Sequence, residues 1–191
     1  MVTEKRSKQE NADSKGSASA SRKRDRPASA RRASAATSTR KSSTGARRRQ
    51  ARVLTLQLLY EIDVTGHPAT DVLDRTFAEP SAPVAIRDHV TRLVSGVLAA
   101  RGEIDPFIAA AAPAFPLPQI PAIDRNVLRL AVFELLHEPA VPPKAAINEA
   151  VELAKHFGGD NSSRFVNGVL GTILDRIPSS GQGASPESPP A

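Results

Sequence analysis

The chain has 191 residues, no cysteine, no tryptophan and a formal net charge of +6. Without cysteine it forms neither disulfides nor thiolate metal sites, and its four histidines lack the spacing of a zinc motif. No apolar run approaches the roughly 18 residues of a membrane span, and we find no signal-peptide core, so we expect a soluble cytoplasmic protein without a metal or cofactor.

The positive charge lies at one end of the chain. Residues 1–52 hold 16 Lys and Arg against four Asp and Glu, whereas residues 53–191 hold 10 against 16. Residues 1–45 are rich in Ser, Ala and Arg, with almost no large apolar side chains, so we expect a disordered basic tail. Three interpretations stay open for it: a solvated tail, an arm that binds RNA or DNA without sequence preference, or an organelle transit peptide.

Residues 46–112 are expected to form a first helical bundle. A helix should begin near Ala46, with apolar side chains at helical spacing, and end at Gly66 and Pro68. A short amphipathic segment around Val72, a longer helix over residues 84–101 and a further turn or two over 103–112 follow. A proline-rich segment follows, PAFPLPQIP at residues 113–121. It cannot be helical, and we place a domain boundary there.

Residues 122–177 are expected to form a second bundle of three helices. The first, IDRNVLRLAVFELLHE, is apolar on most of its circumference, which predicts burial at the centre of a bundle. Proline opens the next helix at 142–143, Gly158 and Gly159 end it, and one of residues 160–162 caps the last. Residues 178–191 read as a second disordered tail. The predicted fold is all-α, with two small three-helix bundles.

No arrangement of residues in the sequence predicts an active site. There is no phosphate-binding glycine loop, no nucleophile elbow and no cluster of metal ligands, which indicates a binding protein rather than an enzyme. The segment RRRQAR at residues 47–52 is the strongest candidate for binding, because arginine suits phosphate and positive charge at a helix start opposes the dipole. These arginines could also be no more than the last residues of the basic tail.

Three segments together resemble the NusB family of bacterial transcription antitermination factors. They are RRQARVLTLQLLYEID, IDRNVLRLAVFELL, and VPPKAAINEAVELAKHFGGDNSSRFVNGVL, in that order over residues 47–177. The resemblance implies a non-catalytic bacterial protein that pairs with NusE, a small-subunit ribosomal protein. The pair would bind single-stranded boxA RNA in nascent ribosomal RNA transcripts. With other Nus factors it would act on RNA polymerase indirectly.

The resemblance also implies which residues carry these contacts. RNA would meet Arg48, Arg49 and Arg52 of the arginine-rich segment, and Arg164, Phe165 and Asn167 would lie beside the RNA path. NusE would meet Tyr60 and Asp124. Many members of the family carry an acidic residue where this chain has Asn161, and one fewer negative charge there could raise RNA affinity.

The string FVNGVL at residues 165–170 places Asn and Gly inside a predicted helix, although both lower helix propensity. We expect Gly168 to allow close packing on a neighbouring helix. Asn167 would make either a specific polar contact or a hydrogen bond to a buried backbone group. Two other functions stay open, a protein–protein scaffold in ribosome assembly and an accessory domain of a ribosomal RNA methyltransferase system. A homodimer that hides the RNA face is a further alternative.

Overall fold

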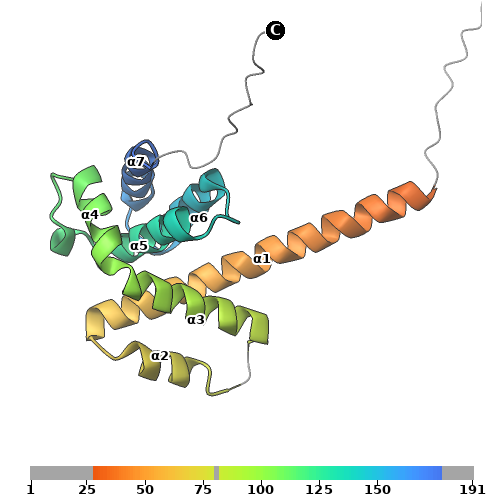
Figure 1. Ribbon diagram of the computed structural model, residues 1–191, viewed down its shortest axis with the longest axis horizontal. Coiled ribbons are helices and arrows are strands. Elements are labelled where there is room, and N and C mark those ends of the chain that lie inside the picture. The colour runs from red at the N-terminus through yellow and green to blue at the C-terminus, as the bar shows by residue number, and fades with distance from the viewer. Residues whose placement is uncertain (1–27, 80–81, 178–191) are drawn as a thin grey trace, which may run out of the picture. The chain divides into compact units, whose positions relative to one another are not determined.

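In the computed structural model, the backbone is described for residues 28–79 and 82–177, and side chains from residue 45 onward within these ranges. All regular structure in these ranges is helical, which confirms the predicted all-α class (Figure 1). The elements are α1 (Ala28–Thr65), α2 (Ala69–Thr76), α3 (Val84–Ala99), α4 (Arg101–Ala111), the 3₁₀ turn η1 (Leu117–Gln119), α5 (Ala122–His137), α6 (Pro143–Phe157) and α7 (Ser162–Leu174).

The chain divides into two compact units, residues 1–40 and residues 41–191. In the first unit, the described residues 28–40 are helical and belong to α1. Helix α1 therefore begins at Ala28, earlier than the start near Ala46 that the sequence predicts. This stretch is rich in Ala and Arg, which are good helix formers, although it has no large apolar side chains. The expected disorder of residues 1–27 and 178–191 lies outside the described residues.

Helix ends in the second unit follow the glycines and prolines of the sequence. Gly66 has φ of 72°, a left-handed conformation that glycine adopts without strain, and α1 ends at the residue before it. Helix α6 begins at Pro143 and ends before Gly158. A Cβ atom at Gly158 would lie 2.4 Å from Ser162 Oγ, so only glycine fits where this turn meets the start of α7.

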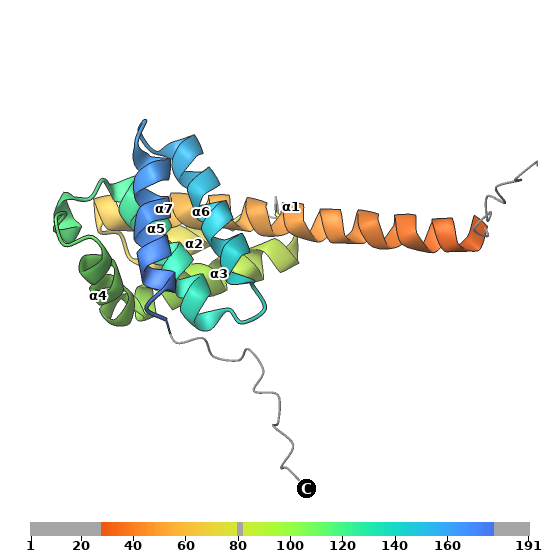
Figure 2. The ribbon, with the colours of Figure 1, turned by 90° about the horizontal axis from the view of Figure 1, so that it is seen from above.

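Helix α5 is the centre of the second unit, as its apolar circumference predicts. It packs against α3, α4, α6 and α7, and its residues are buried on nearly every side from Val127 to Glu134. Both views show α6 and α7 lying side by side against α5, with α2 and α3 beside the later part of α1 (Figures 1 and 2). This arrangement leaves the ends of the helices and their loops to form the surfaces described below.

One hydrophobic core joins the two predicted bundles. Buried side chains of α1, α3 and α4 fall in the same cluster as those of α5, α6 and α7. The predicted boundary at residues 113–121 is largely non-helical, with only the short η1 turn. The buried apolar side chains of the two halves therefore pack together in one core. The boundary between two bundles stays a prediction.

A charged cluster around Asp63 links α1 to α4 and α5. Asp63 Oδ2 accepts hydrogen bonds from Arg125 Nη2 at 2.7 Å and from Asn126 Nδ2 at 3.0 Å. Its Oδ1 lies 2.9 Å from Arg101 Nη2 and 3.1 Å from Arg129 Nη1. Burial alone would raise the pKa of Asp63, but these hydrogen bonds and the positive charges of the arginines lower it below 3.8. The ionised carboxylate therefore holds three helices together.

Candidate nucleic-acid interface

The segment RRRQAR lies on α1 within the second unit and exposes its first three arginines. Arg47, Arg48 and Arg49 are all exposed. Arg49 Nε lies 3.5 Å from Glu149 Oε2, and its Nη2 lies 3.8 Å from Glu152 Oε2. Both distances exceed a direct hydrogen bond, and exposed pairs of this kind contribute little to stability. The Arg49 guanidinium can therefore exchange these carboxylates for a phosphate at small cost.

Arg52 is placed differently from its neighbours and from the sequence-based expectation. Its side chain is 6% exposed, and its Nε donates to both oxygens of Glu134, at 2.9 and 3.0 Å. Burial raises the pKa of Glu134, and the Arg52 guanidinium opposes that rise by stabilising the carboxylate. The structure thus gives Arg52 a part in fixing α1 to α5, and its guanidinium is buried.

Two of the three predicted residues of α7, Arg164 and Phe165, line an open hollow, whereas Asn167 does not. Arg164, Phe165 and Gly168 line a cavity of about 540 Å³, together with the end of α4 and the following loop; we call it the α7 hollow. The Phe165 ring packs edge-on against Phe115, with 5.5 Å between centroids. An aromatic pair beside an exposed arginine is a surface on which a base can stack and a phosphate can bind.

The close-packing role expected for Gly168 is wrong. A Cβ atom built on Gly168 would meet nothing within 4 Å, and the residue is exposed. Asn167 is exposed too, so it does not serve a buried backbone group. Both residues face outward, so the Asn and Gly within FVNGVL lie on the surface side of α7. Its buried side is formed by Val166, Val169 and Leu170.

The two residues expected to meet a protein partner differ in exposure. Tyr60 is 40% exposed on α1. Asp124 is only 4% exposed, because Ser162 from the start of α7 covers it and donates a hydrogen bond from Oγ to Oδ2 at 2.9 Å. The other oxygen, Oδ1, has no hydrogen-bond partner among the described residues. Burial raises the pKa of Asp124, partly offset by Ser162.

Asp124 nevertheless lines a cavity of about 560 Å³, which we call the Asp124 hollow. Phe115, Phe157 and Phe165 line it as well. A partner reaching Asp124 must therefore enter this hollow, since the carboxylate does not lie on an open surface. The structure brings Asp124 and Phe165 to one cavity and Arg49 and Arg52 to the acidic side chains of α5 and α6. Among the described side chains, no hydrogen bond or ion pair joins these two groups.

Several residues at these surfaces were not predicted from the sequence. Glu134 and Glu149 hold the arginine-rich segment, and Phe115 and Phe157 add exposed aromatic rings, at 54% and 36% exposure. Phe115 lies in the proline-rich segment, where a large aromatic side chain outside any helix is a usable signal for a surface site. The acidic partners gave no such signal, because they lie about a hundred residues away in sequence.

Within residues 28–79 and 82–177, no helix is both long and apolar enough to cross a membrane. The same residues bring no three His, Asp or Glu side chains together as a metal site.

Comparisons with known proteins give a consistent result. The model of the NusB family matches residues 49–175. A transcription antitermination protein NusB from Dehalococcoides mccartyi (strain CBDB1) is 50% identical over 126 residues, which cover 66% of this chain and 88% of that protein. The NusB of Herpetosiphon aurantiacus is 46% identical over 137 residues, covering 70% and 94%.

Solved structures of similar fold point the same way. T. maritima NusB superimposes with a TM-score of 0.63 at 30% identity, covering 67% of this chain and 90% of that one. A structure of antitermination factors NusB and NusE in complex with dsRNA gives a TM-score of 0.62 at 25% identity, covering 68% and 97%.

Proposed function

The chain belongs to the NusB family, and we propose that it is a transcription antitermination factor that binds boxA RNA of nascent ribosomal RNA transcripts together with NusE. The complex would keep RNA polymerase elongating through ribosomal RNA operons in the bacterial cytoplasm. Its part in this process is binding and not catalysis. Support comes from the relatives named as antitermination proteins and from the NusB structure that contains NusE and RNA.

One observation carries the RNA-binding part of the proposal. Three consecutive arginines are exposed on α1, near the start of the part of this helix that belongs to the second unit. Among them, Arg49 makes only long, exposed ion pairs. A phosphate can replace these contacts with shorter, charge-assisted hydrogen bonds, and each replaced contact adds to affinity in a salt-dependent way. Arg48 and Arg49 therefore form the proposed phosphate-binding edge.

A second surface would supply base contacts. In the α7 hollow, Arg164 lies beside the Phe115–Phe165 pair, and Asn167 is exposed on the same helix. Stacking on an aromatic ring is worth roughly 1–3 kcal/mol per base. NusE would use Tyr60, whose ring is exposed, and the Asp124 hollow. Asp124 lies in the wall of this hollow, and its Oδ1 has no hydrogen-bond partner among the described residues.

Fluorescence anisotropy with labelled boxA RNA tests the proposal. The full chain is titrated into boxA RNA and into a scrambled RNA of equal length at near-physiological salt, with and without NusE. Because the related complex contains dsRNA, single-stranded and duplex boxA are compared. We expect boxA to bind more tightly than the scrambled RNA and NusE to strengthen the difference. Equal binding of both RNAs, unaffected by NusE, would contradict the proposal.

A matched pair of variants tests the arginine edge. Arg49→Gln should weaken boxA binding and reduce the slope of log K against log salt by about 0.7–0.9. Arg75→Gln removes the same charge from α2, at a side chain of similar exposure that also pairs with a glutamate. This control should leave both affinity and slope close to the wild-type values. Equal losses in the two variants would mean that only net charge matters.

A further inference from the structure

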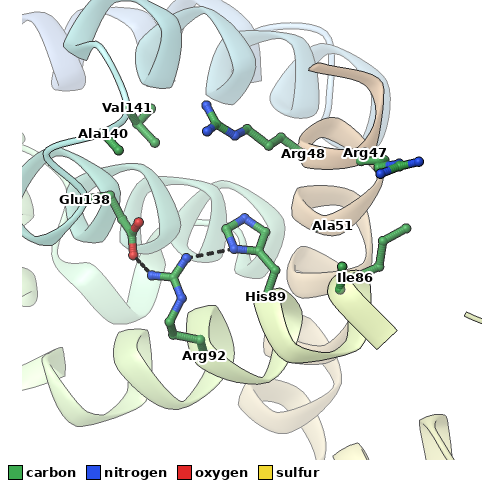
Figure 3. A pocket seen from close by; sticks show the side chains of 10 residues that line it. Arg47, Arg48, Ala51, Ile86, His89, Arg92, Glu138, Ala140 and Val141 are labelled. Carbon is green, nitrogen blue, oxygen red and sulfur yellow. Dashed lines mark hydrogen bonds and ion pairs between the residues drawn. The ribbon is translucent and has the colours of Figure 1, made fainter. Parts of the chain in front are cut away.

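A third hollow lies away from the α7 and Asp124 hollows, where α1, α3 and the loop after α5 meet (Figure 3). We call it the α1–α3 hollow. Its volume is about 310 Å³, at the lower end of the usual range for small-molecule sites. Its walls include Ala51, Ile86 and Val141, which are apolar, so its interior suits a flat apolar group rather than a bare ion.

Basic side chains surround these apolar walls. Arg47 and Arg48 come from α1 and Arg92 from α3, against a single acid, Glu138. Figure 3 shows the Arg48 side chain extending over the hollow towards Val141, whereas Arg47 points away from it. Within the described side chains, no hydrogen bond or ion pair is found for Arg48. Its guanidinium is therefore available to an anionic group at the opening of the hollow.

His89 is fixed in one tautomer by its neighbours. Arg92 donates from Nη2 to His89 Nδ1 at 2.7 Å and from Nη1 to Glu138 (Figure 3). Because a guanidinium only donates, Nδ1 must accept, and the ring proton lies on Nε2. Burial lowers the pKa of His89, and the positive charges of Arg92, Arg52 and Arg48 lower it further, so the ring is neutral at pH 7. His89 thus offers one N–H donor, and Arg92 is its positioning residue.

Apolar walls, an N–H donor and an available guanidinium are what a nucleotide requires, since its base needs an apolar surface and edge contacts and its phosphate needs arginine. We propose that the α1–α3 hollow holds one unstacked nucleotide of the bound RNA, with the base against Val141, His89 Nε2–H donating to it, and the phosphate at Arg48. This inference rests on the proposed RNA-binding function. It extends the RNA path from the arginine edge across α3.

Filling the hollow tests the inference without changing charge. Val141→Phe places a ring in the hollow, and Val84→Phe makes the same substitution at a 69% exposed position of α3 that does not line it. We expect Val141→Phe to weaken boxA binding about tenfold, the scale of losing one stacked base. Val84→Phe should bind as the wild type does. Urea unfolding of both variants shows whether either has lost stability.

His89→Leu gives a readout that a loss of folding would not mimic. The substitution keeps bulk but removes the Nε2–H donor, and it changes no charge because the ring is neutral. We expect weaker boxA binding with an unchanged salt slope, whereas Arg49→Gln lowers both the affinity and the slope. If Val141→Phe proves unstable, this variant decides the question.

The outcomes separate this inference from the proposed function. Wild-type affinity in Val141→Phe and His89→Leu, with a loss in Arg49→Gln, would overturn the nucleotide site and leave the antitermination function standing. Weaker NusE binding with unchanged RNA affinity would also overturn it, because the hollow would then receive a protein. Absence of boxA binding by the wild-type chain would overturn both.

Discussion

Replacing Arg52 with Gln separates the buried, structural arginine from the arginines that we propose bind RNA. Arg52 belongs to the same segment as Arg49, yet its side chain is 6% exposed and pairs with a Glu134 side chain that is 2% exposed. The substitution leaves the Glu134 carboxylate buried without its guanidinium. We therefore expect Arg52→Gln to act mainly on stability and Arg49→Gln mainly on RNA binding.

The size of the effect follows from the geometry. Removing one partner of a buried ion pair destabilises a protein by about 3–5 kcal/mol, because the remaining charge stays desolvated. Glu149 Oε2 lies 3.8 Å from Arg52 Nη1, so this second carboxylate also loses a positive neighbour. The total stability of a small domain is about 5–15 kcal/mol, and a loss of this size is large on that scale.

Urea unfolding at pH 7 measures the loss. Arg52→Gln should lower the free energy of unfolding by about 3–5 kcal/mol. The double variant Arg52→Gln with Glu134→Gln should recover part of the loss, because no unpaired charge is then buried. Arg49→Gln, at a side chain that is 55% exposed, should change stability by less than about 1 kcal/mol.

BoxA anisotropy on the same variants completes the test. At a temperature where Arg52→Gln is still folded, we expect it to bind RNA with nearly wild-type affinity and salt slope. The reasoning is refuted if Arg52→Gln unfolds like the wild type but loses RNA affinity and slope as Arg49→Gln does. That result would mean that the guanidinium leaves Glu134 to contact RNA.

Three further changes have defined outcomes. Asp63→Asn should lower the free energy of unfolding by roughly 3 kcal/mol at pH 7, as expected for a broken buried ion cluster. The folded pKa of Asp63 is lowered from its ordinary 3.8, so the carboxylate stabilises the fold above pH 3.8. The difference between wild type and variant in urea unfolding should therefore shrink as the pH falls through the folded pKa of Asp63. Asp124→Asn should raise stability at pH 7, because burial raises the folded pKa of Asp124 and disfavours its ionised form. This gain should shrink as the pH falls through the raised folded pKa and be absent once the acid is protonated in both the folded and the unfolded chain. A gain in urea unfolding that grows on acidification would contradict this prediction. Deleting residues 1–45 should flatten the salt dependence of RNA binding, and an unchanged slope in a salt titration would show that the basic tail does not contact RNA.

Local features of the sequence predicted the helices of the second unit. Gly66, Pro143 and Gly158 mark helix ends, because the backbone conformations that glycine and proline favour affect only the adjacent helical turn and do not depend on tertiary contacts. The apolar circumference of residues 122–137 predicted the central helix, since burial on all sides requires apolar residues on all sides. The exposed arginines at 47–49 were equally visible as a run of charge, although the structure places them inside α1, which begins at Ala28.

Side-chain partners distant in sequence could not be predicted in this way. Arg48, Arg49 and Arg52 look alike in the sequence, but the rotation of α1 against α5 directs only Arg52 towards Glu134, 82 residues away. The same rotation aligns Arg48 with His89 and Arg92 at the α1–α3 hollow.

Asp124 shows the same division at a helix start. Its place at the beginning of α5 follows from the sequence, where a carboxylate suits the helix dipole. Its burial depends on Ser162, which reaches it only because α7 packs across the start of α5. The sequence by itself determined which segments are helical and which of their faces are apolar, because these properties depend on neighbours within a few residues. Only the tertiary structure decided which charged side chains are buried and which can meet a ligand, because that depends on how the helices are rotated and packed against one another.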